Sequence, residues 1–202
     1  MSVSQATWAL TLVTAPEVEP VSLTDAKLHL RVDVSDDDDL ITALVQATRE
    51  QAEAFTRRAL ITQTWELVLD AFPSSSTIAV PLPPLQSVSS IKYKVDGGTE
   101  YTFSSDSYVV DTDSEPGRIV LEDGAAWPGD TLYEAAAVRV RFVAGYGEAA
   151  SDVPESIRAG MKLLLGHFYE NREATVGVGN MQVLPLGAEM TWWPYRVLRF
   201  PG

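Results

Sequence analysis

The chain has 202 residues, of which 46% are hydrophobic, and a net charge of −13 from 28 acidic and 15 basic residues. The apolar content excludes a wholly disordered chain, and the absence of cysteine excludes disulfides, thiolate metal sites and cysteine nucleophiles. The negative charge argues against a protein that grips nucleic acid through its phosphates, because such binding needs a basic surface. It is compatible with a protein that surrounds DNA without gripping it.

Residues 1–60 are predicted to form an N-terminal arm followed by two helices. A short strand over 7–13 leads to a helix over 22–32, whose first turn Ser22 or Thr24 can cap. A longer helix is predicted over 36–58, because apolar residues recur there at the spacing of one helix face.

An acidic run opens the longer helix, formed by Asp36, Asp37, Asp38 and Asp39. Negative charge is favourable at this end of a helix, because the helix dipole is positive there. We therefore interpret the run as a charged helix terminus rather than a metal site. Its functional interpretation is an acidic surface that lines a channel or faces another subunit.

Residues 61–150 are predicted to form an inserted antiparallel β domain, a barrel or a sandwich. The pattern changes there to alternating, β-favouring residues, and Asp96-Gly97-Gly98 is typical of a hairpin turn. The predicted strands cover residues 63–69, 77–80, 88–95, 99–103, 108–110, 118–121 and 138–143.

Residues 151–176 are predicted to return to the helical core through a third helix over 154–172. Pro154 and Glu155 suit its first turn, and its apolar stripe suggests that it packs on the helix over 36–58. The fold class is therefore α+β, a small helical bundle with an inserted β domain and an extended C-terminal arm over 177–202.

The C-terminal arm has an unusual composition. Prolines at 185, 194 and 201 exclude a long helix, yet the arm is rich in aromatic residues and arginine, as binding hot spots are. One interpretation is a tail folded on its own core, and the other is an arm that docks on a neighbouring subunit. The predicted docking residues are Leu184, Leu186, Trp192, Trp193, Tyr195, Arg196, Leu198, Arg199 and Phe200.

Signals for metal or cofactor binding are weak. Four acids from Asp111 to Glu122 have the spacing of a calcium loop, but Pro116 stands where that loop needs glycine. The Gly177-Val178-Gly179 segment lacks the third glycine and the strand–turn–helix setting of a dinucleotide site. We predict neither a metal nor a cofactor.

Signals for catalysis are equally weak. His29 and His167 lack an evident serine partner, and the chain has no Gly-x-Ser-x-Gly segment. A carboxylate pair for glycoside chemistry would have to come from abundant acids such as Glu66, Asp70, Glu122 and Asp123. We predict that the protein is not an enzyme, and a carboxylate-based hydrolase is the weakest alternative.

Seven stretches in this order resemble one family. They are Val21–Val32, Ala54–Trp65, Leu82–Val88, Tyr108–Asp111, Phe142–Gly147, Val153–Arg158 and His167–Glu173. The pattern resembles the phage head–tail connector proteins, also called head-completion adaptors, including those of gene transfer agents. The resemblance spans about residues 21–198.

The resemblance implies a structural role in a virion or gene transfer agent particle. Such adaptors form a ring, typically of twelve copies, under the portal, extend the DNA channel and offer a surface to the stopper or tail-completion protein. The implied partners are therefore the portal protein, the stopper and other copies of the chain, while DNA passes without sequence-specific binding. No membrane partner is expected, because no run of about 20 apolar residues occurs, and synthesis is expected in the bacterial cytoplasm.

The runner-up hypothesis is a free-standing β-rich binding module for a sugar or a surface protein. Its binding residues would be sought among Tyr93, Tyr101 and Tyr108. Tyrosines on alternating strand positions also occur as ordinary packing residues, so their placement decides between the two interpretations.

Overall fold

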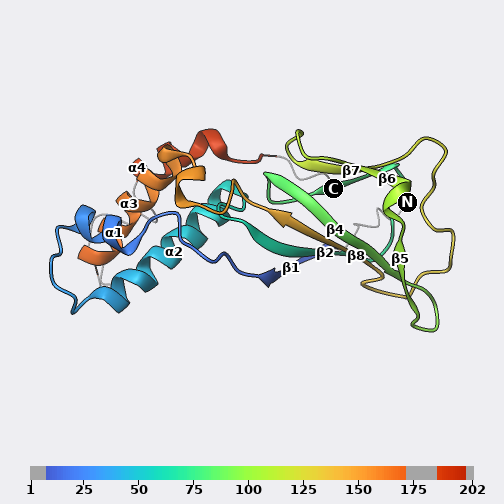
Figure 1. Ribbon diagram of the computed structural model, residues 1–202, viewed down its shortest axis with the longest axis horizontal. Helices are drawn as coiled ribbons and strands as arrows, with labels where there is room; N and C mark the ends of the chain where they lie inside the picture. Colours follow the sequence, from blue (N-terminus) through green and yellow to red (C-terminus); the bar gives the residue numbers. More distant parts are fainter. Residues whose placement is uncertain (1–7, 172–185, 199–202) are drawn as a thin grey trace, which may run out of the picture. The chain divides into compact units, whose positions relative to one another are not determined.

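The computed structural model describes residues 8–171 and 186–198. The chain divides into two compact units (Figure 1). A β unit comprises residues 1–15, 62–145 and 197–202, and a helical unit comprises residues 16–61 and 146–196. The first strand thus belongs to the β unit, although residues of the helical unit follow it directly in sequence.

The helical unit has four α-helices, among the residues that the structure describes. They are α1 (Leu23–Leu30), α2 (Asp38–Thr56), α3 (Glu155–Glu170) and α4 (Leu186–Trp192), and a 3₁₀ turn, Trp193–Tyr195, continues α4. Ser22 caps α1 as predicted, since its Oγ accepts a hydrogen bond from the Asp25 N–H at 3.0 Å. At their C-terminal ends, α1 and α2 close on Arg31 and Arg57, which adopt positive φ angles of 57° and 58°.

The apolar faces of these helices meet in one core. Apolar residues recur along α2 and α3 at helical spacing, so each helix has one face to bury. The buried apolar residues are Val21, Ala26, Ile41, Val45, Ala52, Leu60, Ile61, Val153, Ile157, Met161, Leu164, Leu165, Ala188 and Trp192. Two of them, Ala188 and Trp192, come from α4, so the tail contributes to this core.

In the β unit, the described residues form two antiparallel sheets. The larger has the order β1-β2-β8-β4-β5, with bounds Trp8–Thr14, Gln63–Leu69, Val138–Ala144, Leu85–Lys94 and Glu100–Phe103. The smaller has the order β3-β7-β6, with bounds Thr77–Val80, Gly117–Leu121 and Tyr108–Asp111. The alternation along β8 is complete, because Val138, Val140, Phe142 and Ala144 are buried while Arg139 and Arg141 are exposed.

The helix and strand predictions agree closely with the structure, and the differences have local causes. The strand predicted over 88–95 begins earlier, at Leu85, and two register shifts along its pairing with β8 explain why alternation did not reveal its start. The sheets are open at β1 and β5 and at β3 and β6, so the unit is not a closed barrel.

The tail differs from the predicted extended arm, because residues 186–195 are helical and pack on α3. The seven residues of α4 end before Pro194, and Pro194 lies in the first positions of the three-residue 3₁₀ turn. A proline is tolerated there, because it can begin a helical turn. In the described parts of the chain, no helix combines the length and apolarity that a membrane span requires.

Candidate functional site

The tail is held to the helical unit by Trp192. Its side chain is fully buried, and its indole N–H donates a 3.0 Å hydrogen bond to the carbonyl of Ile157 in α3. Gly160 makes room for this contact, since a Cβ at that position would overlap the Trp192 ring. Phe55 of α2 lies against the same ring, with centroids 5.8 Å apart. This placement fits the interpretation of a tail folded on its own core.

The opposite side of the tail is apolar and exposed. Met190 and Trp193 are 75% and 57% exposed and lie three residues apart, on one side of the helical segment. The guanidinium of Arg196 lies 5.3 Å from the Trp193 ring centroid and 5.2 Å from that of Phe55. We call Met190, Trp193 and Arg196 the tail surface. Exposed aromatic residues beside arginine are the usual composition of a binding hot spot.

The predicted docking residues are thus divided between core and surface. Trp192 is in the core, whereas Trp193 and Leu198 are exposed, at 57% and 75%. Tyr195 and Arg196 are half-buried, and Leu186 begins α4. Leu184, Arg199 and Phe200 lie outside the described residues.

A second arginine fixes the end of the tail, and the sequence analysis did not find it. Arg58 is buried, and its Nε donates a 2.5 Å hydrogen bond to the carbonyl of Tyr195. The partners are separated by 137 residues, and Arg58 has the sequence setting of an ordinary basic residue at a helix end. No local pattern could have revealed the pair.

The acidic run at the start of α2 is also divided. Asp36 and Asp39 are exposed. Asp38 forms a 2.5 Å ion pair with Lys27, and Asp37 accepts a 2.5 Å hydrogen bond from the Tyr169 hydroxyl. Half of the run therefore ties α2 to α1 and α3, and the other half faces solvent.

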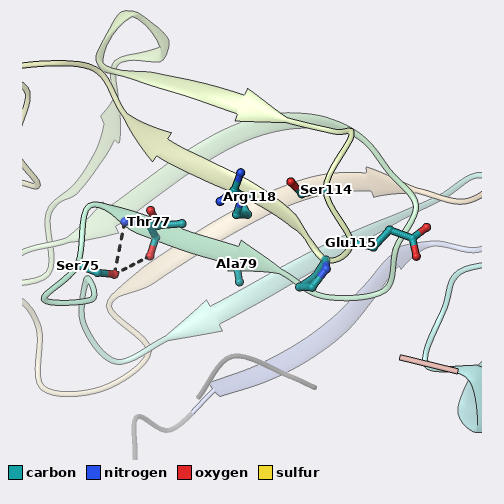
Figure 2. A pocket seen from close by; sticks show the side chains of 7 residues that line it. Ser75, Thr77, Ala79, Ser114, Glu115 and Arg118 are labelled. Atoms are coloured by element: carbon teal, nitrogen blue, oxygen red, sulfur yellow. Dashed lines mark hydrogen bonds between the residues drawn. The ribbon is translucent and has the colours of Figure 1, made fainter. Parts of the chain in front are cut away.

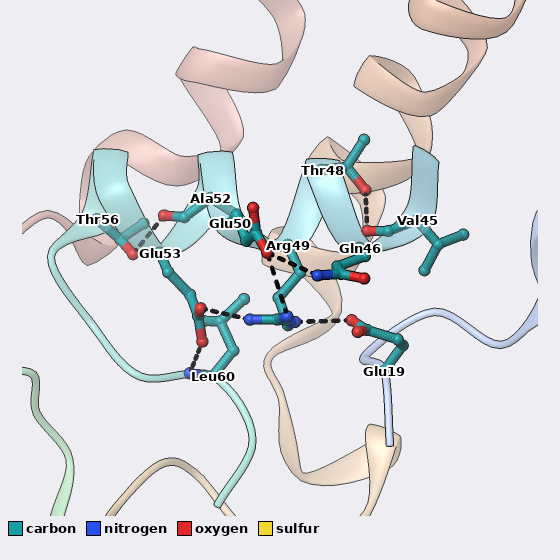
Figure 3. Close-up of polar contacts among 10 residues, drawn as sticks. All are labelled: Glu19, Val45, Gln46, Thr48, Arg49, Glu50, Ala52, Glu53, Thr56 and Leu60. Carbon is teal, nitrogen blue, oxygen red and sulfur yellow. Dashed lines mark hydrogen bonds and ion pairs between the residues drawn. The ribbon is translucent and has the colours of Figure 1, made fainter. Parts of the chain in front are cut away.

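Arg49, a buried arginine of α2, links α2 to the segment that precedes α1, as Figure 3 shows. The Arg49 side chain is 8% exposed and donates at 2.8 Å to Glu19, which precedes α1, and at 2.8 Å to Glu53. Glu53 also accepts the Leu60 N–H at 2.9 Å. Burial raises the pKa of Glu19 above its ordinary value, against the opposing effect of Arg49. The Arg49–Glu53 pair has the i,i+4 spacing of an ordinary surface pair, and the sequence analysis found neither this pair nor the contact with Glu19.

The acids considered for metal or hydrolytic chemistry have structural partners. Both Asp111 oxygens accept hydrogen bonds, from the backbone N–H groups of Asp113 and Ser114, from the Ser114 hydroxyl and from Arg118. These hydrogen bonds hold the pKa of Asp111 well below its usual range. Glu66 pairs with Arg139 and Arg141 at 2.7 and 3.1 Å, and Asp70 accepts the Ala136 N–H. Across the described ranges, no cluster of three potential metal ligands occurs.

A shallow hollow of about 480 Å³ lies on the smaller sheet (Figure 2). It is lined by Ser75, Thr77, Ala79, Ser114, Glu115, Pro116 and Arg118. Its cation, Arg118, is engaged by Asp111 at 2.5 Å, and Ser75 is engaged with the backbone of Thr77. The hollow therefore offers neither a free charge nor an activated nucleophile.

The tyrosines of the runner-up hypothesis belong to a cluster of stacked rings in the β unit. Tyr93 stacks on Tyr101 at 5.7 Å, and Phe103 stacks on Tyr108 at 5.9 Å. Trp127 stacks on Phe72 at 5.0 Å and donates its indole N–H to the Ser75 carbonyl. Trp127 also contacts Phe103, and Phe72 contacts Tyr93, so the loop after β7 is attached to β4 and β5. Packing accounts for Tyr93 and Tyr108, whereas Tyr101 is 50% exposed.

Comparison with family profiles finds a match over part of the chain. Residues 20–95 match the sequence profile of the phage gp6-like head–tail connector proteins. These residues include α1, α2 and strands β2 to β4, and they contain three of the stretches that carried the resemblance in the sequence. Over these residues the match agrees with the resemblance noted in the sequence. A comparison with curated proteins finds no match.

Solved structures share the fold over almost the whole chain. A chain of the neck of an empty gene transfer agent particle, computed with C6 symmetry, has a TM-score of 0.79 at 23% identity and covers 96% of this chain and 98% of its own. A chain of the native gene transfer agent virion has a TM-score of 0.78 at 22% identity, covering 96% and 97%. A chain of the native neck, computed with C12 symmetry, has a TM-score of 0.77 at 23% identity, covering 96% and 98%. The likeness establishes the α+β fold, since it extends over both units.

Proposed function

We propose that the protein is a structural subunit of the head–tail junction of a phage or gene transfer agent particle. Copies of the chain form a ring under the portal, extend the DNA channel and present an attachment surface to the stopper or tail. The match of residues 20–95 to the head–tail connector family carries the proposal. Its support in the fold is the near full-length likeness to chains of gene transfer agent necks.

The tail surface is the proposed contact with the portal. Met190 and Trp193 present large apolar side chains to solvent, and burying them on a partner is favourable by roughly 25 cal/mol per Å². Trp192 anchors the segment from behind, so the surface is held in place before binding and less conformational freedom is lost on docking. Leu198 is exposed as well and extends the set of candidate contacts along the sequence.

The acidic surplus suits the proposed channel. Negative walls repel phosphates, so DNA slides past them rather than binding. Asp36 and Asp39 are the members of the acidic run that face solvent, and they are the proposed channel or inter-subunit residues. Asp37 accepts a hydrogen bond from Tyr169 and Asp38 pairs with Lys27, so these two residues hold the helices together.

Replacement of Trp193 tests the portal contact. We expect W193A to reduce binding to the particle's own portal protein by about tenfold or more, since a central aromatic residue of an interface typically contributes about 2 kcal/mol or more. The measurement is the number of copies bound per portal ring at increasing concentration, by native mass spectrometry. Tyr101→Ala is the matched control, because Tyr101 is an aromatic residue of similar exposure, 50%, in the β unit.

Trp192 is left unchanged in this test, because it is fully buried and a double replacement of Trp192 and Trp193 would also affect the fold. If W193A binds the portal as the wild type does, the tail surface is not the portal contact. If the wild type itself does not bind an intact portal ring, the connector function is contradicted.

A further inference from the structure

Strand β1 forms an edge of the larger sheet, and its only irregularity along the pairing with β2 is a register shift between Leu12 and Thr14. Among the described residues, no strand pairs with its outer side, so alternate backbone N–H and C=O groups point away from β2. Natural edge strands are commonly short, or carry charges or proline that prevent pairing with another chain. The seven residues of β1, Trp-Ala-Leu-Thr-Leu-Val-Thr, contain no charge, proline or glycine.

The opposite edge of the same sheet is protected. Strand β5 has four residues, and Glu100 at its start pairs with Lys92 at 2.8 Å. The two edge strands of this sheet therefore differ in length and in charge. β1 has the properties of a strand that pairs with another chain, and β5 does not.

The side chains of β1 are also exposed and apolar. Leu12 and Val13 are 44% and 43% exposed, and their neighbours along the strand are mostly exposed too. Exposed apolar side chains next to unpaired backbone groups are the features of a β-strand addition site, in which the backbone supplies affinity and alternate side chains supply specificity.

The charge distribution points to another copy of the chain as the partner. Each copy carries a net charge of −13, so copies repel one another wherever acidic surfaces meet. The first charged residue of the chain is Glu17, which leaves β1 in an uncharged segment. Two copies can approach at this strand without bringing like charges together.

We propose that β1 is a contact between neighbouring copies in the ring, made by adding an extended segment of the next copy to its open edge. The proposal rests on the proposed function, because a closed ring needs a head-to-tail contact between different surfaces of adjacent copies. It differs from the tail surface, which faces the portal, so the two contacts respond to different replacements.

A matched pair of replacements tests this proposal. Val13→Glu places a negative charge on the β1 edge, and Val109→Glu places one on β6, an edge strand of the smaller sheet where Val109 is 50% exposed. Both remove the same apolar group and add the same charge. We expect V13E to raise the concentration needed to fill the portal ring by about tenfold or more, because a charge is desolvated at the contact, and V109E to change it by less than about twofold.

Hydrogen exchange gives a second, independent measurement on the wild type. Amides of residues 9–14 that point away from β2 are expected to exchange more slowly in the assembled ring than in the monomer. Thermal unfolding of both variants shows whether they fold, and the exchange result decides the matter if V13E does not.

Three results are possible and each has one meaning. A V13E ring that forms like the wild type, or wild-type rings whose β1 amides exchange as in the monomer, overturns the β1 contact and leaves the connector function intact. Failure of the wild type to assemble on the portal overturns the connector function and this inference with it. Loss of assembly in V13E alone, with slowed exchange in β1, supports the proposal.

Discussion

At the scale of single residues, Trp192 and Trp193 have opposite roles although they are adjacent. Trp192 points into the core and donates a hydrogen bond to Ile157, whereas Trp193 faces solvent. The sequence left two alternatives for this aromatic segment, a tail folded on its own core or an arm docked on a neighbouring subunit. Trp192 fits the first, and docking through Trp193 stays a proposal. Which of two neighbouring tryptophans lies inside depends on how α4 packs on α3, and this contact joins residues far apart in the chain.

Replacement of Trp192 by alanine is expected to destabilise the protein by about 3–5 kcal/mol, because a large buried side chain is lost and a cavity remains. The Ile157 carbonyl loses its hydrogen bond as well. W193A is the control and is expected to cost less than about 1 kcal/mol. Chemical denaturation measures both, and equal losses in the two variants would contradict the assigned orientations.

Two glycines of α3 give a second residue-scale prediction. Gly160→Ala is expected to destabilise the protein by about 1–3 kcal/mol, because the added Cβ overlaps Thr191 and Trp192. Gly166→Ala is expected to stabilise it by about 0.5–1 kcal/mol, since the nearest atom, Nε2 of His29, is 3.6 Å away and alanine favours a helix. Thermal unfolding should therefore shift in opposite directions for the two variants, and a shared direction would show that α4 does not press on α3.

At the scale of elements, most helices and strands were predictable and their tertiary roles were not. The strands over Gln63–Leu69 and Thr77–Val80 have the bounds predicted from alternation alone, because their patterns are uninterrupted. The start of β4 and the helix in the tail were missed, since register shifts and packing on α3 override the local pattern. The Arg58–Tyr195 and Arg49–Glu19 contacts were also missed, because each joins segments far apart in sequence.

Arg49 joins α2 to the segment before α1, and its replacement is expected to lower the stability of the helical unit. Its replacement by alanine leaves Glu19 and Glu53 without their cation in a half-buried site, at an expected cost of about 3–5 kcal/mol. Lys162→Ala removes an exposed pair with Glu155 and is expected to cost less than about 1 kcal/mol. Urea denaturation compares the two, and hydrogen exchange in residues 16–22 should rise only for R49A. Unchanged exchange there would mean that Arg49 does not hold this segment.

The turn between β6 and β7 gives a pH-dependent prediction. The pKa of Asp111 is lowered in the folded state by hydrogen bonds from Ser114 and Arg118. Because the pKa is lower in the folded state, the ionised carboxylate stabilises the fold at pH values above its ordinary pKa of 3.8. This stabilisation is lost progressively as the pH falls below 3.8. Asp111→Asn should therefore be less stable than the wild type at pH 6, and the difference should shrink toward pH 3. Denaturation at several pH values measures it, and a difference independent of pH would contradict the role of the ionised carboxylate.

At the scale of the whole molecule, the sequence indicated a resemblance to the head–tail connector proteins, because the matching stretches lie in order along most of the chain. The match over residues 20–95 and the neck chains of similar fold agree with that inference. The surfaces that join copies or partners were less accessible, because exposure is a property of the folded units. Leu12 and Val13 gave no signal in the sequence beyond a short strand, and their exposure on an edge strand emerges only in the sheet.

The most direct test of the connector function is a native mass measurement of the full chain with the intact portal ring from the same particle. We predict saturable binding of many copies per portal ring, with a fixed stoichiometry that W193A weakens and Y101A does not. Absence of binding, or binding of single copies without saturation at a fixed number, would contradict the head–tail connector function.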